Sequence, residues 1–328
     1  MPAAVTQNIM FIFPGQGSQY QGIGSDIHRE FACARAVYEQ ASNLLGYDIA
    51  ELSAQGPEEK ITLTRYTQPI LLTHHLACLA VFRELTDGRI QPGVTAGHSL
   101  GEYSALVAAG ALSFEDALRL VQKRGEFMSE YGAGEMLALP LSLDEAQPLA
   151  EKHYCAVAGC NLKDQTVVGG LPADLDTLTA EVSELYPRKR PVRLKTEGAF
   201  HTYYMVKAAQ HFRAELDQAA FSIGTTRVLS NYTGEFHDPD PASVRTRLFF
   251  QLFHPVLWLQ CLTTAFTAGV SQVIEFGGGI GTGTTPAEKR PNLESIIKKA
   301  QRGTDFEVSY QSAINLATLT AAAEAAGH

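Results

Sequence analysis

The chain has 328 residues, of which 45% are hydrophobic and 19% charged, and its formal net charge is -9. This composition is ordinary for a globular protein, and the acidity argues against nucleic acid as a partner. The length favours one large domain with a smaller inserted or appended one. No apolar run is long enough to span a membrane, and the N-terminus lacks the basic region of a signal peptide. We therefore expect a protein that works away from both membranes and nucleic acids.

The five cysteines are scattered, without a Cys-x-x-Cys pair. A sparse, odd set is typical of reduced thiols, so we expect a cytoplasmic protein whose cysteines are small buried hydrophobes. We find no metal-ligand cluster in the sequence. The run "GGGIGTG" follows a predicted strand but lacks the acidic residue of a dinucleotide-binding fold. No metal and no permanently bound cofactor are therefore expected.

The first part of the chain predicts alternating strands and helices. The apolar residues 8–13 predict a buried strand that stops at Pro14, before the turn Gly15-Gln16-Gly17. A second short strand is "GVTAGHS" (93–99), and a helix follows from Leu100. Ser113, with Asp116 three residues later, starts another helix that runs through Tyr131. Further helices are expected at 26–43, 47–53 and 68–87.

The middle of the chain has a different pattern. Strands are predicted at 135–141, 154–162, 164–171 and 190–195, with helices at 142–152 and 172–186. The order β-α-β-β-α-β is the ferredoxin-like signature. We therefore expect a small subdomain, residues 133–196, inserted in a larger α/β domain made of residues 1–132 and 197–328.

The last part returns to the large domain. Strands are predicted at 227–234 and 272–276, and helices at 203–218, 241–253, 256–269 and 292–301. The alanine-rich "LATLTAAAEAAGH" (316–328) predicts a fraying helical tail.

Gly97-His98-Ser99-Leu100-Gly101 has the spacing of a nucleophile elbow, and it lies between a predicted strand and a predicted helix. Such a turn presents the serine hydroxyl, and the backbone N–H of Leu100 at the helix start can stabilise negative charge. A serine needs a base, which must be a histidine from elsewhere in the chain. His201, in "GAFHTYYM", is the candidate. His98 adjoins Ser99, but its side chain should point away, so we expect it to line the site. His74, His75, His153, His211 and His237 are taken as structural or surface imidazoles.

The segments "FPGQGSQ", "TQPI", "GHSLGEYSAL", "QKRGEFM", "GAFHTYYM", "QLFHPVLW" and "IEFGGGIG" resemble the malonyl-CoA:acyl carrier protein transacylases. They occur in the family's order and spacing from about residue 9 to about residue 300. The chain looks most like the discrete, trans-acting acyltransferases of modular polyketide synthases, with the fatty-acid enzymes as near neighbours. The resemblance implies an α/β fold: an α/β-hydrolase-like large domain with an inserted ferredoxin-like subdomain.

The resemblance also implies the chemistry. Ser99 and His201 would form a dyad that passes an acyl group from coenzyme A to a carrier protein's phosphopantetheine thiol by a ping-pong route. Gln16 would complete the oxyanion hole with Leu100, although it could be a plain turn residue. A backbone carbonyl near His254 would orient His201.

Substrate-binding roles follow from the same resemblance. Arg124 would bind the malonyl carboxylate through its guanidinium fork, the alternative being a solvated surface arginine. Phe200 would fill the space that a 2-methyl group needs, which favours malonyl over methylmalonyl. Gln68 and Asn161 would line the site, or could simply satisfy backbone groups.

Two rival functions remain open from the sequence. An acyl-carrier-protein hydrolase would use the same Ser99 and His201 with water as the acceptor, but such hydrolases tend to lack the arginine. A non-enzymatic scaffold would bind carriers without catalysis. Acidic carrier proteins could dock on the basic runs 188–195 and 288–302, which could also be ordinary surface charge. We expect the protein to act as a monomer.

Overall fold

The computed structural model describes residues 5–326 and contains two separate sheets. The larger sheet has the strand order β7-β2-β1-β8-β9, and each neighbouring pair is parallel. Its strands are β1 (Val5–Phe13), β2 (Gln91–Gly97), β7 (Arg227–Val228), β8 (Gln272–Phe276) and β9 (Ser309–Ala313).

The second half of the central strand β1, residues 9–13, is entirely apolar and buried because helices cover both faces of the sheet there. Phe11 and Phe13 point into one core cluster, whereas Met10 and Ile12 point into the other. This alternation is the side-chain period of two of a strand. Both β1 and β2 end at the same edge, where Phe13 pairs with Gly97. The turn after β1 and the elbow after β2 are therefore neighbours.

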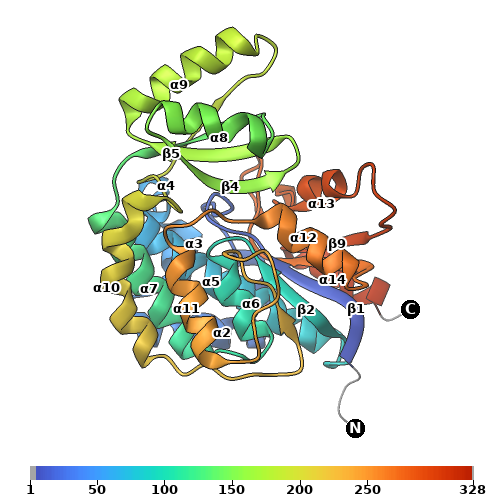
Figure 1. Ribbon diagram of the computed structural model, residues 1–328. Coiled ribbons are helices and arrows are strands. Elements are labelled where there is room, and N and C mark those ends of the chain that lie inside the picture. Colours follow the sequence, from blue (N-terminus) through green and yellow to red (C-terminus); the bar gives the residue numbers. More distant parts are fainter. Residues whose placement is uncertain (1–4, 327–328) are drawn as a thin grey trace.

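Helices on both sides make the large domain, and Figure 1 shows them grouped below the small sheet. On the Phe11 and Phe13 side, the core joins the residues of α2, α5, α6, α7, α10, α11 and α14; on the other side, it joins those of α12 and α13. The helices of this domain are α1 (Ser25–Glu30), α2 (Ala32–Leu45), α3 (Ile49–Gln55), α4 (Glu58–Ile61), α5 (Thr64–Leu85), α6 (Gly101–Ala108), α7 (Phe114–Tyr131), α10 (Val206–Gln218), α11 (Pro241–Gln251), α12 (Trp258–Thr267), α13 (Glu294–Ala300) and α14 (Leu316–Ala326), with short 3-10 turns η1 (Tyr203–Met205) and η2 (Pro286–Glu288).

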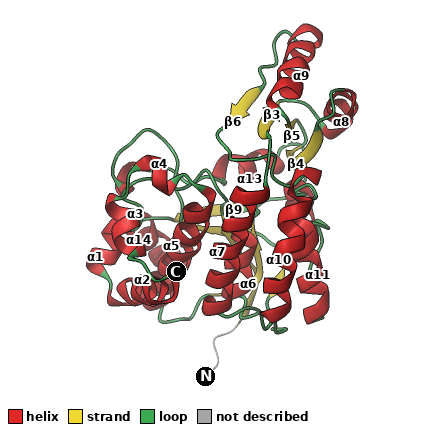
Figure 2. Ribbon diagram, turned by 90° about the vertical axis from the view of Figure 1, so that its left-hand side faces the viewer, coloured by secondary structure: helices red, strands yellow, loops and turns green. Residues whose placement is uncertain are grey.

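The smaller sheet is antiparallel, with the order β4-β5-β3-β6. It consists of β3 (Glu135–Leu139), β4 (Ala156–Leu162), β5 (Gln165–Gly170) and β6 (Val192–Leu194), with α8 (Leu143–Lys152) and α9 (Pro172–Leu185) between them. The two helices pack on one face of this sheet and form their own core. Figure 2 shows this unit standing at one end of the large domain. Its other face, which includes Met136, Ala158 and Val167, turns toward the large domain and lines the cavity described below.

Most of the predicted elements are present, and the differences have local causes. The expected helix 26–43 is broken at Phe31, which has extended backbone angles, so α1 and α2 are separate. The expected strand 227–234 is only Arg227–Val228, because Ser230 and Asn231 turn away to make contacts behind the elbow. Strand β9 was not predicted, since "SYQSA" carries no apolar alternation.

The C-terminal segment also differs from the expected fraying tail. Helix α14 buries Leu319 and Ala322 in the main core, and Asp26 accepts a hydrogen bond from the backbone N–H of Leu316 at 2.8 Å. The helix is thus packed against the core from Leu316 to Ala323, and the last residues of the expected tail lie outside the described part. No helix between residues 5 and 326 has the length and apolar character of a membrane span.

Candidate active site

Ser99 sits in a strained turn between β2 and α6. Its φ is 52°, a left-handed backbone angle that is uncommon for a residue other than glycine. The turn is closed so tightly that a Cβ on Gly97 would lie 1.9 Å from the carbonyl carbon of Gly101. A Cβ on Gly101 would lie 2.1 Å from the carbonyl oxygen of Phe13. The two glycines therefore allow strand and helix to meet, and this geometry presents the Ser99 hydroxyl.

His201 lies against Ser99, in the position expected of its general base. Its Nε2 is 2.7 Å from Ser99 Oγ, and its Nδ1 is 2.7 Å from the backbone carbonyl oxygen of Gln251. A carbonyl only accepts, so Nδ1 carries the proton and Nε2 is free to accept from the serine. Burial first, and then the charge of Arg124, lower the pKa of His201 to about 3. The imidazole is therefore neutral at pH 7, the form that a general base needs.

The residue that orients His201 differs from the expectation. His254 does not contact His201: its Nδ1 is 3.0 Å from the carbonyl oxygen of Phe250, and its ring packs among aromatic side chains. The orienting carbonyl belongs to Gln251, at the end of α11. The motif "QLFHPV" indicated the right segment but not the right residue, because a backbone carbonyl leaves no trace in side-chain identity.

Arg124 projects from α7 to the nucleophile. The side chain is 1% exposed, and its Nη2 donates to Ser99 Oγ and to Gln251 Oε1, each at 3.1 Å. Burial lowers the pKa of the guanidinium. Between residues 5 and 326 no carboxylate forms an ion pair with it, and its Nε has no hydrogen-bond partner. The reading of Arg124 as a solvated surface arginine is therefore wrong, and a buried cation beside Ser99 is available to an anionic ligand.

Gln16 and Leu100 line the same cavity as Ser99. The side-chain Nε2 of Gln16 donates to Thr64 Oγ1 at 3.1 Å, so this amide is partly engaged. The turn that holds Gln16 lies against the elbow, since a Cβ on Gly15 would come 2.7 Å from the carbonyl oxygen of His98. Both residues thus stand at the N-terminal end of α6, where backbone N–H groups favour negative charge.

The remaining predicted residues divide into two groups. His98, Asn161 and Phe200 line the cavity, and His98 Nε2 lies 2.9 Å from Asn161 Oδ1. Burial lowers the pKa of His98, so this ring is a neutral hydrogen-bonding group and has no contact that would make it the base. Gln68 is buried behind the site instead, with Nε2 3.4 Å from Met128 Sδ. It does not reach the cavity, so its predicted lining role is not what the structure shows.

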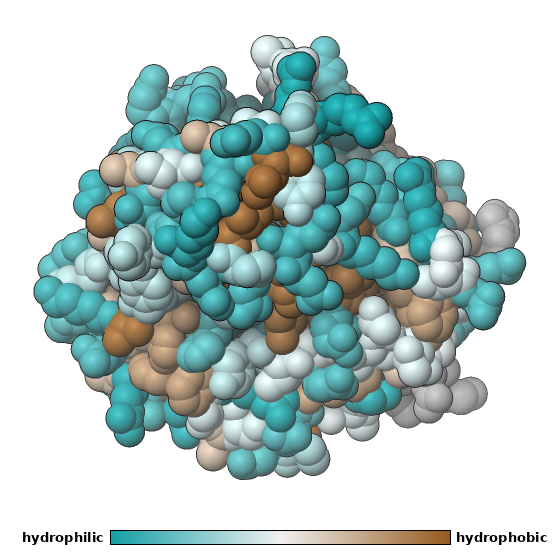
Figure 3. Space-filling model, turned by 45° about the horizontal axis from the view of Figure 1, so that its top comes forward, coloured by the Kyte–Doolittle hydropathy of each residue, from teal (hydrophilic) through white to brown (hydrophobic). Residues whose placement is uncertain are grey.

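The cavity measures about 870 Å³ and lies between the two sheets. Figure 3 shows the end of the molecule that carries the small sheet, a largely hydrophilic face with apolar side chains visible in its hollows. The large domain supplies the polar wall, including Gln16, His98, Ser99, Arg124 and His201; the small sheet supplies Met136, Ala158, Asn161 and Val167. A cavity of this size can hold an acyl thioester with part of its carrier arm.

Sequence reasoning missed two residues that hold the dyad. Asn231 Oδ1 accepts the backbone N–H of Ser99 at 2.6 Å, and its Nδ2 donates to the carbonyl oxygen of Gly97 at 2.8 Å. Gln251 donates from Nε2 to the Ser99 carbonyl oxygen at 3.0 Å. Asn231 lay in a predicted strand and Gln251 in a predicted helix, so neither pattern singled them out.

Comparison with known proteins places this arrangement in a family. Residues 10–247 match the acyl transferase domain family. The chain is 34% identical over 303 residues to the malonyl CoA-acyl carrier protein transacylase of Bacillus subtilis, covering 90% of each protein. It is also 34% identical to that organism's polyketide biosynthesis malonyl CoA-acyl carrier protein transacylase PksC, over 83% of this chain and 93% of the relative.

Solved structures agree with the sequence relatives. A malonyl transacylase solved in complex with a type II polyketide synthase acyl carrier protein superimposes with a TM-score of 0.86 and 29% identity, over 97% of this chain and 99% of that one. The α/β fold is therefore that of the malonyl transacylases, and this chain belongs to the malonyl-CoA:acyl carrier protein transacylase family.

Proposed function

We propose that the protein transfers a malonyl unit from coenzyme A to the phosphopantetheine thiol of an acyl carrier protein. The observation that carries this proposal is the convergence on one hydroxyl of a neutral base, His201 at 2.7 Å, and a buried cation, Arg124 at 3.1 Å. A base beside a serine supports acyl transfer, and a buried cation selects an acyl group with a free carboxylate. The relatives' names support the same substrate pair.

The reaction proceeds in two balanced steps through Ser99. Ser99 Oγ attacks the thioester carbon while its proton moves to His201 Nε2, and the C–S bond breaks as that proton passes to the departing coenzyme A sulfur. The carrier thiol then gives its proton to His201 and attacks the seryl ester. The ester C–O bond breaks, Ser99 regains the proton, and malonyl leaves on the carrier.

The tetrahedral oxyanion of each step is assigned to the space between Gln16 and Leu100. Both residues line the cavity beside Ser99. Leu100 is the N-cap of α6, so its N–H belongs to the positive end of the helix. A fixed donor at the site of developing charge typically contributes about 2.7–4 kcal/mol to transition-state stabilisation.

Phe200 supports malonyl as the extender unit. Its ring lines the cavity next to His201, is 5% exposed, and packs where a Cβ on Gly198 would come 3.2 Å from it. A 2-methyl substituent on the acyl group would compete with this ring. Such a contact discriminates by about 1–3 kcal/mol.

The carrier protein is expected at exposed cations of the run 188–195, which reaches the cavity at Lys195. Arg188, Arg190 and Lys195 are exposed, and Lys195 itself lines the cavity. In the second basic run, Lys298 is tied to Glu294 and Lys289 to the carbonyl oxygen of Gly281. In the run 188–195, Arg193 is paired with Glu135 and Asp176, but the three exposed cations named above remain, so we favour this run as the surface for an acidic carrier.

The wider setting follows from the same reasoning. We propose that residues 1–132 and 197–328 are an α/β-hydrolase-like domain and that residues 133–196 are a ferredoxin-like subdomain, which the strand order of the small sheet supports.

The protein acts as a monomer in the cytoplasm, since one chain supplies the whole dyad and its five cysteines are free. The relatives' polyketide names favour that pathway.

The direct test is an incubation of the protein with malonyl-CoA, with and without a phosphopantetheinylated acyl carrier protein, followed by mass spectrometry of the carrier and assay of free coenzyme A. Transfer predicts malonyl-carrier formation, with coenzyme A release that stops after one turnover when the carrier is omitted. Steady coenzyme A release without a carrier would make water the acceptor and the protein a hydrolase.

A further inference from the structure

A buried glutamate lies behind the elbow and is not itself part of the Ser99–His201 dyad. Glu102, in the first turn of α6, is fully buried. Its Oε2 accepts the backbone N–H of Asn231 at 3.0 Å and the Nε2 of Gln251 at 2.8 Å. Its Oε1 faces His237 Nε2 at 2.8 Å. A buried carboxylate needs such donors, so these contacts fix the position of all three neighbours.

The Asn231 contact connects Glu102 to the nucleophile. Glu102 holds the Asn231 backbone, and the Asn231 side chain spans the turn by accepting from Ser99 N and donating to the Gly97 carbonyl. Ser99 has a left-handed φ of 52°, which persists only where surrounding contacts impose it. Glu102 therefore makes a hydrogen bond to Asn231, the residue whose side chain maintains the strained turn.

The Gln251 contact connects the Glu102 carboxylate to the base, His201, and to Arg124, the proposed binder of the substrate carboxylate. The Gln251 amide donates to Glu102 and accepts from Arg124, so its orientation is fixed from both ends. The backbone carbonyl of this residue accepts from His201 Nδ1. Glu102 thus holds the residue that sets the tilt of the His201 ring.

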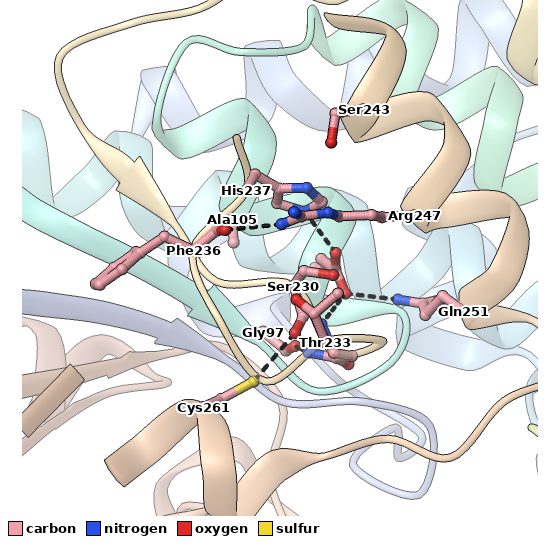
Figure 4. Close-up of polar contacts among 12 residues, drawn as sticks. Gly97, Ala105, Ser230, Thr233, Phe236, His237, Ser243, Arg247, Gln251 and Cys261 are labelled. Carbon is pink, nitrogen blue, oxygen red and sulfur yellow. Dashed lines mark hydrogen bonds and ion pairs between the residues drawn. The ribbon is translucent and has the colours of Figure 1, made fainter. Parts of the chain in front are cut away.

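His237 completes the arrangement from the loop between β7 and α11. Its side chain is 5% exposed, and Figure 4 shows it above Ser230 and Gln251. It is not among the residues that line the cavity beside Ser99. The Asn231 N–H and the Gln251 amide both donate to Oε2, so His237 Nε2 is the hydrogen-bond partner that the described residues provide for Oε1. Without His237, Oε1 would be a buried acceptor with no partner among the described residues, and the carboxylate would gain by turning toward its other donors.

We propose that His237, acting through Glu102, is a positioning residue of the transacylase, one that sets Ser99 through Asn231 and His201 through Gln251. This inference rests on the proposed Ser99–His201 chemistry. Misplacing a catalytic group by about 1 Å can cost on the order of 100-fold in rate. His237 contacts neither Ser99 nor Arg124, and it reaches Arg124 only through Glu102 and Gln251, so we expect its replacement to slow acylation more than it weakens substrate binding.

The test compares three replacements of one side chain. His237→Leu removes the donor to Glu102, and His237→Gln returns an amide nitrogen near the place of Nε2. His237→Asn carries a shorter amide, near the place of Nδ1, that does not reach Glu102. Rapid-quench mass spectrometry measures acylation of Ser99 at saturating malonyl-CoA. The dissociation constant of malonyl-CoA is measured separately in a Ser99→Ala background.

We expect the Leu and Asn variants to acylate at least about tenfold more slowly than the wild type, with the Gln variant largely restored. The dissociation constant of malonyl-CoA should rise by a smaller factor than the acylation rate falls. His153→Leu is the matched control, because His153 also pairs with a glutamate, Glu181, but in the small subdomain. Circular dichroism checks that each variant is folded. If the Leu variant does not fold, the comparison of the Gln and Asn variants is the test.

The inference is overturned by Leu and Asn variants that acylate at the wild-type rate, or by a Gln variant as slow as Asn. It is also overturned if slower acylation is matched by weaker malonyl-CoA binding. A wild-type protein that is never acylated contradicts the proposed function itself. An acylated wild type with unaffected His237 variants contradicts only the positioning role.

Discussion

Arg124 Nη2 lies 3.1 Å from Ser99 Oγ, so the one arginine that lines the cavity in the described part of the chain contacts the nucleophile itself. The side chain also donates to Gln251 Oε1 and lies over the Tyr103 ring at 5.7 Å. Neither neighbour is an anion at pH 7, since burial raises the pKa of Tyr103. The cation is therefore held in place by neutral hydrogen-bond partners, with no carboxylate of the described residues in direct contact, which suits a site completed by a substrate carboxylate.

Replacement of Arg124 by alanine removes this cation. We expect kcat/KM for malonyl-CoA to fall on the order of 100-fold or more, because the malonyl carboxylate would be buried without a partner. Use of acetyl-CoA should persist or increase, which the ratio of the two kcat/KM values measures. Arg119→Ala, on the same helix but in an exposed pair with Glu115, is the control. Malonyl loading retained by the Arg124 variant would refute the carboxylate assignment.

The Phe200 ring sets the choice between extender units. Phe200→Ala should raise the ratio of methylmalonyl to malonyl transfer by about tenfold, since a single methyl group is worth about 1–3 kcal/mol in a pocket. Competition between the two thioesters in one reaction measures the ratio within the same folded protein, so a loss of stability cancels. An unchanged ratio would mean that another wall of the cavity excludes the methyl group.

The pH dependence of acylation reports the state of His201. With a pKa of about 3, the ring stays neutral as pH falls from 7 to 5. We expect a level acylation rate over this range, whereas a base with a pKa of 6.5 would lose about 25-fold in rate between pH 7 and pH 5. Because the unfolded state binds this proton more readily, the free energy of unfolding falls below pH 6.5. An acid limb near pH 6.5 in protein shown to be folded would contradict the assignment.

Glu275 predicts a pH effect of opposite sign on stability. Burial raises its pKa to about 7, while its carboxylate accepts from the backbone N–H groups of Asn292 and Leu293, which line the cavity mouth. The folded state then binds the extra proton between pH 4.5 and 7, so this group's contribution to the free energy of unfolding falls as pH rises through that window. Denaturant titrations of wild type and Glu275→Gln should show a stability difference that varies over this window. A difference independent of pH would count against the raised pKa.

The sequence was sufficient where function rests on contiguous motifs. The elbow around Ser99, the segment around His201 and the helix that carries Arg124 were all predicted, and the structure brings the three side chains together. Such a motif can be recognised in a single sequence because the close packing at Gly97 and Gly101 leaves room only for glycine at these two positions.

The groups behind the dyad could not be predicted in the same way. Gln251 acts through a backbone carbonyl, which any residue would supply, and Glu102 resembles an ordinary acidic residue in the first turn of a helix. His237 meets Glu102 across 135 positions of chain, and the structural role expected for it did not include that contact. Strand β9 was missed because its polar residues form an edge of the sheet and need no apolar alternation.

The measurement that tests the central claim most directly is the location of the acyl group. The protein is mixed with malonyl-CoA, quenched, digested and analysed by peptide mass spectrometry, beside Ser99→Ala. A malonyl ester on the peptide that contains Ser99, absent from the variant and lost when carrier protein is added, is the predicted result. A malonyl group on any other residue, or transfer to the carrier that persists in Ser99→Ala, would contradict it.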